Sequence, residues 1–488
     1  MPRLYQLAAK EVVEKVRDKE TTAEEYVSSI FERIREAESR VHAFVTLIED
    51  EALQRAREID EKASKGKTLG RLAGVAVAVK DSICAKDVRT TCSSRMLENF
   101  VPPYDAAVIE KIHMEDAVVI GKTNMDEFAM GSSTETSFFG PTYNPWDLSR
   151  VPGGSAGGSG AALAADETAL AFGADTGGSI RCPASYCSVV GIKPTYGLVS
   201  RYGLVAYANS LEQIGPMAKS VYDCALFLSV IAGYDPRDST SVRMPPKDYT
   251  VFLKDGVEGF KIGVPKEFFG EGTSEDVEKR VWEAIYKLED LGASYEEVSF
   301  PSLEYALSTY YIIAMSEASS NLARYDGLRY GYRIDRDDTD WSSVYSKNRR
   351  VGFGAEVRRR ILLGTYALSA GYYSKYYLKA LKVRTLIRRD FEAAFRKFHV
   401  LIGPTMPIPP FKIGEKIQDP LALYMCDIDT VPANLAGLPA ISVPCGFAGS
   451  LPIGMQIMAA PFREDLMLNV AYTFEKNTTY KDRKPPLK

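Results

Sequence analysis

The sequence predicts an α/β fold in which a large mixed β-sheet is covered by helices on both faces. Apolar runs rich in valine, isoleucine and alanine recur at 75–79, 117–121 and 169–174, with helical patterns between them. Their small and branched residues are typical of strands buried on both faces of a sheet. Three more apolar runs, separated by proline-rich turns, lie near the C-terminal end: 400–403, 440–443 and 454–459. We therefore expect the first and last parts of the chain to share one sheet, with a helical segment inserted between them.

The 488 residues are expected to form one domain with three regions: an N-terminal helical layer (1–70), a core that carries the glycine-rich motifs (71–220) and a mainly helical insertion (303–398). In the first region, Thr22 and Glu25 form a capping box ahead of apolar residues at helical spacing. Residues 6–40 are therefore predicted to form two helices. This layer serves either for packing or as a surface for another protein of a complex, and its amphipathic pattern favours packing.

The segment between the core and the insertion has its own pattern. Residues 234–246 are rich in turn formers and predict a loop. A strand is expected at 261–265, followed by a helix at 277–291 that Gly292 ends. Within the insertion, apolar residues from Val383 to Phe398 predict a helix with one face toward the core.

Composition excludes several classes of protein. A net charge of −4 gives no general attraction to nucleic acid or to an anionic membrane. The chain has no apolar run of about 18 residues, so no membrane span is expected. Its N-terminal residues become charged before any apolar stretch, which argues against a signal peptide. The seven cysteines show no CxxC spacing, which predicts reduced thiols, a cytoplasmic location and no zinc or other metal.

The candidate functional segment runs from Gly153 to Arg181. Nine of the 37 glycines fall between Gly153 and Gly191. Two Gly-Gly-Ser segments, ending at Ser155 and Ser179, flank an alanine-rich helix and an apolar strand. A serine after a glycine pair lies on a tight turn beside free backbone N–H groups. Acyl transfer needs both features, because the serine can serve as the nucleophile and the N–H groups as the oxyanion hole.

Two other interpretations of these glycines are a flexible linker and a phosphate-binding loop. A linker does not contain an Ala-Ala-Leu helix and a buried strand. A P-loop needs a lysine directly after its glycines, and none is present here. The pattern therefore favours a catalytic serine.

The base that would activate such a serine is not a histidine. The chain has only three, His42, His113 and His399, and none lies near the serine motifs. Lys80 ends the apolar run 75–79 and is either a solvated strand end or a buried functional amine. Because burial disfavours the charged form, a lysine at this position can lose its proton near neutral pH.

The motifs together resemble the amidase signature family. The resemblance is carried by Lys80, by the segment Gly153–Gly158, by Asp175–Arg181 and by the Pro452-x-Gly-x-Gln456 element. Ala156 departs from the pattern, because the family usually has a second serine there. Within the family, the segments 310–331, 352–373 and 427–446 are similar to the glutaminase components of tRNA-dependent amidotransferases, and this likeness covers essentially the whole chain.

The resemblance implies a Ser-cisSer-Lys triad. Ser179 is the expected nucleophile, Ser155 the proton relay and Lys80 the base, with a cis peptide bond between Gly154 and Ser155. A hydroxyl can relay a proton because it donates and accepts together. The N–H groups of residues Thr176, Gly177, Gly178 and Ser179 are the expected oxyanion hole.

The resemblance also implies a pocket for free glutamine, to which the insertion contributes. Arg359 is expected to bind the α-carboxylate, Asp427 the α-ammonium, and Tyr310 to line the same pocket. Arg359 stands in the run Arg358–Arg360, of which only one side chain can enter a pocket. Asp429 is an alternative to Asp427.

The expected function is hydrolysis of glutamine through an ester on Ser179. In a heterotrimer of A, B and C subunits, the ammonia would pass to the B subunit, which activates Glu-tRNA(Gln) and/or Asp-tRNA(Asn), while the C subunit holds the pair together. No cofactor is expected in this chain, since ATP and Mg²⁺ would bind to the B subunit. One alternative is a stand-alone amidase for small or acyl amides, which would use the same triad. Another is a non-catalytic scaffold protein, against which the intact Lys80, Ser155 and Ser179 argue.

Overall fold

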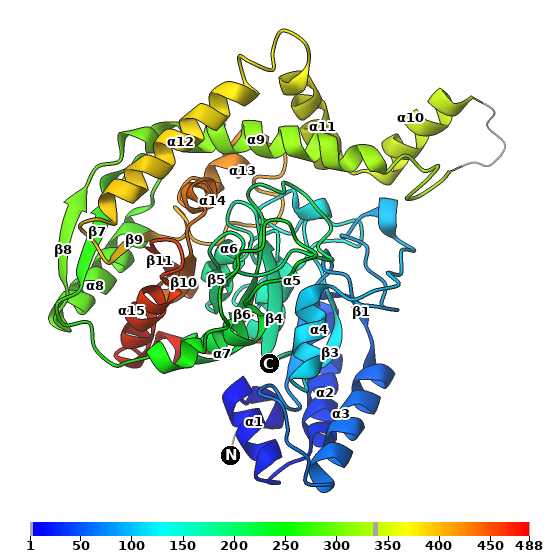
Figure 1. Ribbon diagram of the computed structural model, residues 1–488, viewed down its shortest axis with the longest axis vertical. Coiled ribbons are helices and arrows are strands. Elements are labelled where there is room, and N and C mark those ends of the chain that lie inside the picture. The colour runs from blue at the N-terminus through cyan, green and yellow to red at the C-terminus, as the bar shows by residue number, and fades with distance from the viewer. Residues whose placement is uncertain (1–2, 335–339, 488) are drawn as a thin grey trace.

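A computed structural model describes residues 3–334 and 340–487 of the chain, and one mixed β-sheet of 11 strands forms its centre (Figure 1). The strands lie in the order β1-β3-β2-β4-β6-β5-β10-β11-β9-β7-β8. Their bounds are β1 Phe44–Leu47, β2 Ala76–Lys80, β3 Val118–Thr123, β4 Leu170–Asp175, β5 Val190–Lys193, β6 Gln213–Ala218, β7 Lys261–Pro265, β8 Ser294–Val298, β9 Val400–Pro404, β10 Ala440–Ala448 and β11 Leu451–Ala459. The predicted α/β class is confirmed.

Strand pairing explains how the two ends of the chain meet. Strand β2 lies between β3 and β4 and runs parallel to both. Strand β5 pairs antiparallel with β10, so Ile192 lies opposite Ile441 although about half the chain separates them. The expectation that early and late segments share one sheet is therefore confirmed.

Helices cover both faces of the sheet. Helices α5 and α6 pack together on one face, and α7, α8 and α15 form a second packed group. The bounds are α1 Ala9–Arg17, α2 Ala23–Val41, α3 Glu49–Ser64, α4 Ala107–Met114, α5 Gly157–Ala164, α6 Arg181–Cys187, α7 Val221–Ile231, α8 Glu275–Asp290, α9 Ala306–Asn321, α10 Trp341–Gly352, α11 Ala355–Leu368, α12 Tyr377–Ala394, α13 Pro420–Tyr424, α14 Val431–Ala436 and α15 Glu464–Lys476. No helix in the described ranges has both the length and the apolar character that crossing a membrane requires.

The N-terminal helices form where the capping box predicts. The Thr22 hydroxyl accepts the N–H of Glu25 at 3.0 Å, and the Glu25 carboxylate accepts the N–H of Thr22 at 2.9 Å. On α2, the apolar face that includes Tyr26, Ile30 and Phe31 is almost fully buried within the chain. This face of the layer therefore packs against the rest of the protein.

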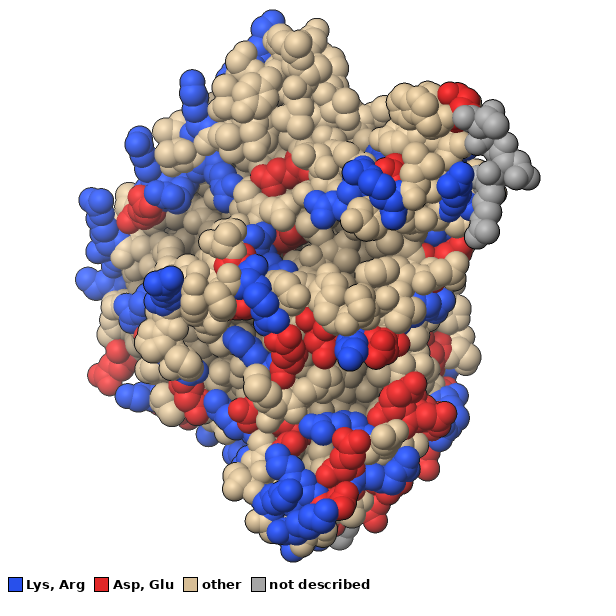
Figure 2. All heavy atoms as spheres, turned by 45° about the vertical axis from the view of Figure 1, so that its right-hand side comes forward, with Lys and Arg blue, Asp and Glu red and all other residues tan. Residues whose placement is uncertain are grey.

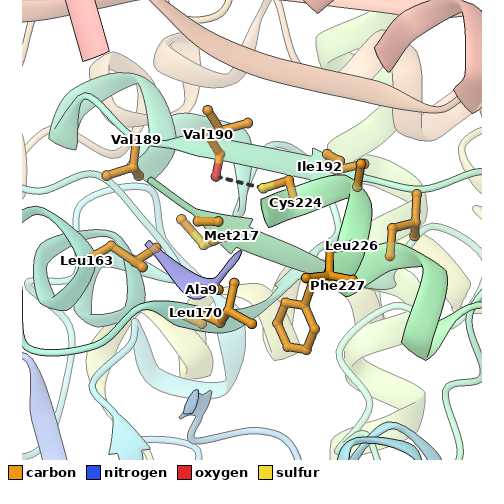
Figure 3. Close-up of a cluster of buried hydrophobic side chains, with 14 of the residues drawn as sticks. Ala9, Leu163, Leu170, Val189, Val190, Ile192, Met217, Cys224, Leu226 and Phe227 are labelled. Carbon is orange, nitrogen blue, oxygen red and sulfur yellow. Dashed lines mark hydrogen bonds between the residues drawn. The ribbon is translucent and has the colours of Figure 1, made fainter. Parts of the chain in front are cut away.

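A tightly packed apolar layer fixes β4, the strand that leads into the second glycine motif. Figure 3 shows side chains of β4, β5, β6 and α7 meeting there, among them Leu170, Met217 and Ile192. The rings of Phe172 and Phe227 lie 4.6 Å apart, and both side chains are fully buried. Burial of each such side chain stabilises the fold by about 1.5–3 kcal/mol. The end of β4 is therefore held rigidly.

The helices α9 to α12 form an arch along one side of the sheet (Figure 1). Helix α9 packs against both α11 and α12. Gly364 of α11 lies so close to the carbonyl of Met315 on α9 that any side chain at position 364 would collide with it. This close crossing fixes how α11 faces the rest of the molecule.

Candidate active site

Lys80 is the last residue of β2, and its side chain is completely buried. Its Nζ donates to the Ser155 Oγ at 2.7 Å and to the carbonyl of Ala174 at 2.9 Å. Burial lowers the pKa of Lys80 to about 7, although the charges of Asp126 and Asp175 oppose that shift. Of the two alternatives for this lysine, the structure therefore shows the buried amine.

Ser155 lies on a turn that is pressed against its surroundings on every side. The Gly154–Ser155 peptide bond is cis, as the resemblance implied, and Gly153 has a φ of +82°. A side chain at position 154 would overlap the carboxylate of Asp126. The glycines of this motif therefore serve close approach of the backbone, and not flexibility.

Ser179 lies on the loop between β4 and α6, beside the Ser155 turn. The N–H of Ala156 donates to the carbonyl of Ser179 at 3.1 Å, so the two serine motifs are in direct contact. Ser179 is 7% exposed, whereas Ser155 is fully buried. This difference suits a nucleophile that meets the substrate and a relay that does not.

The structure narrows the expected oxyanion hole. The N–H of Gly178 donates to the Asp175 Oδ1 at 2.8 Å and is therefore engaged within the loop. The N–H groups of Thr176, Gly177 and Ser179 remain as the expected donors. Gly177 lies against the ring of Tyr310, where a side chain at position 177 would collide with the phenol. This contact places Tyr310 directly beside the loop.

A buried ion pair between Arg181 and Asp175 supports the loop that carries Ser179. Arg181 donates through Nε and Nη2 to the two carboxylate oxygens of Asp175, both at 3.1 Å. Arg181 also donates to Gln456 at 3.0 Å and to Asn434 at 2.6 Å. Burial alone would raise the pKa of Asp175, but Arg181 holds it well below its usual range. The Asp175 carboxylate is thus a fixed acceptor that shapes the loop.

Asp427 ends the short 3-10 helix Met425–Asp427, and its side chain is buried. Its carboxylate accepts the Ser132 hydroxyl at 2.8 Å and the Tyr311 hydroxyl at 2.7 Å. Burial raises the pKa of Asp427 to about 6, against the effect of these two hydrogen bonds. The Thr430 hydroxyl lies 2.5 Å from the carbonyl of Gly177 and 3.1 Å from that of Asp427, so it connects the segment of Asp427 to the loop of Ser179.

The structure distinguishes Asp427 from Asp429. Burial raises the pKa of Asp429 well above its usual range, and its Oδ2 has no hydrogen-bond partner among the described residues. Burial thus disfavours the ionised form of Asp429, and a carboxyl without its charge is a poorer ligand for an ammonium group. Asp427, which is held by two donors, is the better candidate.

The three arginines of α11 have three different environments. Arg358 is exposed, and the side chain of Arg359 is 40% exposed. Arg360 is buried, and it donates to Glu356 at 2.7 Å and to the Tyr207 hydroxyl at 2.7 Å. Arg359 pairs with the other oxygen of the same Glu356. Arg359 is therefore the member of the run that combines a defined position with access to solvent.

An aromatic bridge connects α11 to Asp427. The Tyr424 hydroxyl donates to Glu356 at 2.6 Å, and the Tyr424 ring stacks on Tyr311 with centroids 4.2 Å apart. Tyr311 in turn donates to Asp427. The residues expected to bind the two ends of an amino acid thus belong to one connected cluster.

Sequence reasoning missed several supporting residues. Arg181 and Gln456 both lie in motifs that the sequence shows, and this was the only sign that the two side chains pair with each other. Asn434, Thr430 and Asp126 have no such signal, because their partners are distant in the chain or are backbone groups. None of the three histidines hydrogen-bonds to Lys80, Ser155 or Ser179 in the described structure, and no group of three or more potential metal ligands occurs among the described residues.

A buried lysine amine bonded to a serine, with no histidine beside it, is typical of hydrolases that activate a serine through a lysine. The family model described as Amidase matches residues 25–468. The A subunit of glutamyl-tRNA(Gln) amidotransferase from Methanosarcina mazei is 60% identical over 480 residues, which are 98% of each chain. The protein of the same name from Carboxydothermus hydrogenoformans is 57% identical over 484 residues, covering 99% of this chain and 100% of the relative.

Solved structures agree with this assignment. The crystal structure of the A subunit of glutamyl-tRNA(Gln) amidotransferase from Thermotoga maritima matches with a TM-score of 0.83 and 41% identity, over 100% of this chain and 99% of that one. A bacterial aryl acylamidase of the amidase signature enzymes matches with a TM-score of 0.86 and 26% identity, over 98% of each chain. The chain belongs to the amidase signature family and is an amidase.

Proposed function

We propose that this chain is the glutaminase component of a tRNA-dependent amidotransferase. The observation that carries the catalytic part is the 2.7 Å hydrogen bond from the buried Lys80 amine to Ser155, next to the loop of Ser179. The substrate and assembly are supported by relatives of nearly equal length that are named as the A subunit of glutamyl-tRNA(Gln) amidotransferase.

In the proposed mechanism, neutral Lys80 takes the proton of Ser155 while Ser155 takes that of Ser179. The Ser179 oxygen then bonds to the carboxamide carbon of glutamine, and backbone N–H groups of Thr176, Gly177 and Ser179 stabilise the oxyanion. When the C–N bond breaks, the proton returns through Ser155 to the leaving nitrogen and ammonia departs. Water, activated by the same relay, hydrolyses the glutamyl ester and restores Ser179.

The pocket would recognise both charged ends of free glutamine. Asp427, fixed by Tyr311 and Ser132, is proposed to bind the α-ammonium group. Arg359 is proposed to bind the α-carboxylate, for which a guanidinium has matching geometry. Tyr310 lies against Gly177 and would place the carboxamide at the oxyanion loop.

The proposed partners follow from the same relatives, whose shared name implies an assembly of several subunits. The B subunit would receive the ammonia and use ATP and Mg²⁺ to activate Glu-tRNA(Gln) and/or Asp-tRNA(Asn), and a small C subunit would hold the two together in a heterotrimer. In this proposal the chain itself carries only the ammonia-releasing step.

The test is ammonia release from glutamine by the complex co-purified with candidate B and C subunits. Ser179→Ala should abolish release, because no nucleophile remains. Ser159→Ala is the matched control, since Ser159 is also buried but bonds to the carbonyl of Phe172 and to Thr123. Release that persists in Ser179→Ala would refute the mechanism.

Two comparisons separate this proposal from its alternatives. A stand-alone amidase would hydrolyse simple aliphatic amides at least as well as glutamine, whereas the proposed glutaminase prefers glutamine because of its two charged ends. A scaffold protein would not react with a serine-directed fluorophosphonate, whereas the proposed enzyme is labelled at Ser179.

A further inference from the structure

Two neighbouring carboxylates, Asp126 and Glu127, follow β3 and are almost completely buried, with exposures of 0% and 3%. Neither is one of the residues proposed above to react with or bind glutamine. They lie between the turn of Ser155 and the first turn of α11, which are separated by about 200 residues in the chain. Their hydrogen bonds point in these two directions.

Asp126 organises the loop that clamps the Ser155 turn. Its Oδ2 accepts the N–H groups of Ser133 at 3.2 Å and Thr134 at 2.9 Å. Thr134, which has a φ of +61°, then places its hydroxyl between the two ends of the turn. That hydroxyl donates to the carbonyl of Gly153 at 2.8 Å and accepts the N–H of Gly157 at 3.1 Å.

Asp126 also contacts the turn itself. Its backbone N–H donates to the carbonyl of Ser155 at 3.2 Å. Its carboxylate occupies the space that a side chain on residue 154 would need. The relay serine is thus held directly by Asp126 and indirectly through Thr134.

Glu127 points the other way, toward α11. Its Oε2 accepts the N–H of Gly354, the residue that caps this helix, at 2.8 Å. Its Oε1 accepts the hydroxyl of Ser94. Such an acceptor satisfies a backbone N–H that has no partner within the first turn of a helix. Burial raises the pKa of Glu127 to about 7, although its hydrogen bonds to Ser94 and Gly354 oppose that shift. Glu127 therefore fixes the start of the helix that carries Arg359.

Thr136 ties the two carboxylates together. Its hydroxyl donates to the Asp126 Oδ1 at 2.9 Å and accepts the N–H of Glu127 at 3.1 Å. The two residues are therefore parts of one rigid connection, and not two independent contacts.

We propose that Asp126 and Glu127 are paired positioning residues, through which the fold sets the Ser155 relay and the α11 wall of the glutamine pocket relative to each other. This inference rests on the proposed function, because it assigns separate effects on turnover and on glutamine binding. Asp126 acts on turnover through Ser155, and Glu127 acts on glutamine affinity through α11.

The role of Asp126 can be tested by the pH dependence of kcat, which a merely structural residue would not change. The negative charge of Asp126 raises the pKa of Lys80, as do Asp175, Cys92 and Glu212, while burial lowers it. In Asp126→Asn, the acid limb of the kcat profile should therefore move to lower pH. In Asp126→Ala, which also loses the clamp, kcat should fall by about 10- to 100-fold with little change in KM.

For Glu127 we expect the opposite pattern, a change in KM and not in kcat. Glu127→Ala should raise the glutamine KM several-fold and leave kcat nearly unchanged. Glu127→Gln should restore the KM, because its carbonyl can accept the Gly354 N–H while its amide donates to Ser94. Asp223→Asn is the matched control, because Asp223 is an equally buried carboxylate that accepts the N–H groups of Ala9 and Lys10 far from the site.

Two glutamine-independent measurements keep the test separate from the proposed function. The rate at which a fluorophosphonate labels Ser179 should fall in Asp126→Ala and stay unchanged in Glu127→Ala and Asp223→Asn. Hydrogen exchange should accelerate at 131–136 in Asp126→Ala, and at 354–358 in Glu127→Ala. An unmoved acid limb in Asp126→Asn, or equal effects of both alanine variants on labelling, would overturn the inference. If only glutamine hydrolysis by the wild-type complex were absent, the proposed function would fail while the labelling contrast could still be measured.

Discussion

The sheet side and the helical side of the candidate active site hold their charged groups in different ways. On the sheet side, Lys80, Asp175 and Arg181 are completely buried, and each has several hydrogen bonds. On the helical side, Arg359 is 40% exposed and pairs with one carboxylate, while Leu362 of the same helix is 70% exposed. The upper part of the molecule in Figure 2, where this arch lies, shows broad uncharged areas, with lysine and arginine side chains gathered along its left-hand edge.

This difference matches the separate tasks that we propose for the two sides, catalysis on the sheet side and substrate binding on the helical side. Proton transfer and oxyanion stabilisation need groups fixed in a water-poor site, because reorganisation there would cost rate. Binding an entering amino acid needs charged groups that a substrate can reach. We therefore expect substitutions on the sheet side to reduce turnover or stability, and substitutions on the helical side to change affinity.

Replacement of Lys80 should give the largest effect. Lys80→Arg keeps a cation at the end of β2, but a guanidinium does not give up its proton at neutral pH. We expect kcat to fall by about 10⁴-fold or more, as for loss of a residue that acts as part of a triad. Lys80→Ala should be equally inactive. Substantial glutaminase activity in Lys80→Arg would show that the base lies elsewhere.

Loss of the Asp175 charge should reduce stability strongly. In Asp175→Asn the buried Arg181 keeps its charge without a carboxylate partner, which costs about 3–5 kcal/mol. Asp147→Asn is the matched control, because Asp147 pairs with Arg150 at the surface and such pairs contribute about 1 kcal/mol or less. The free energy of unfolding in urea measures both. Equal losses in the two variants would contradict the supporting role of the buried pair.

The pH dependence should separate the two sides of the site. Lys80 acts in its neutral form, so with a pKa of about 7 the kcat should fall as pH decreases through 7. Asp427 acts in its ionised form, so with a pKa of about 6 the glutamine KM should rise as pH decreases through 6. Asp427→Asn should raise KM and remove only the second effect, and a profile of kcat that is flat from pH 5 to 8 would refute the lysine assignment.

The sheet side was also the side that the sequence predicted best. Strand β2 and the two Gly-Gly-Ser turns are local patterns, and buried strands leave a continuous apolar run that a single sequence displays. Lys80 could be proposed because it ends such a run. The hydrogen bond from the Gly178 N–H to Asp175 could not be predicted, because it depends on which N–H groups the Asp175 carboxylate reaches.

Residues that depend on tertiary approach were the ones missed. Asn434 reaches Asp175 across about 260 positions of the chain, and Glu127 reaches Gly354 across about 230. Nothing local to these residues distinguishes them from ordinary polar residues of a loop or a short helix. For the helical side, only the resemblance singled out Arg359, since three adjacent arginines have the same local pattern.

Replacement of those arginines one by one should give the smallest effect on turnover and decide the helical assignment. Arg359→Ala should raise the glutamine KM by about tenfold or more with kcat nearly unchanged, because one charged hydrogen bond to the α-carboxylate is lost. Arg358→Ala, its exposed neighbour, should leave KM unchanged. Arg360→Ala should instead lower stability, because Glu356 and the Tyr207 hydroxyl both lose the buried guanidinium that donates to them. If Arg358→Ala raised KM and Arg359→Ala did not, the residue that binds the α-carboxylate of glutamine would be Arg358. The partial exposure of Arg359 would then no longer show which face of α11 meets the substrate.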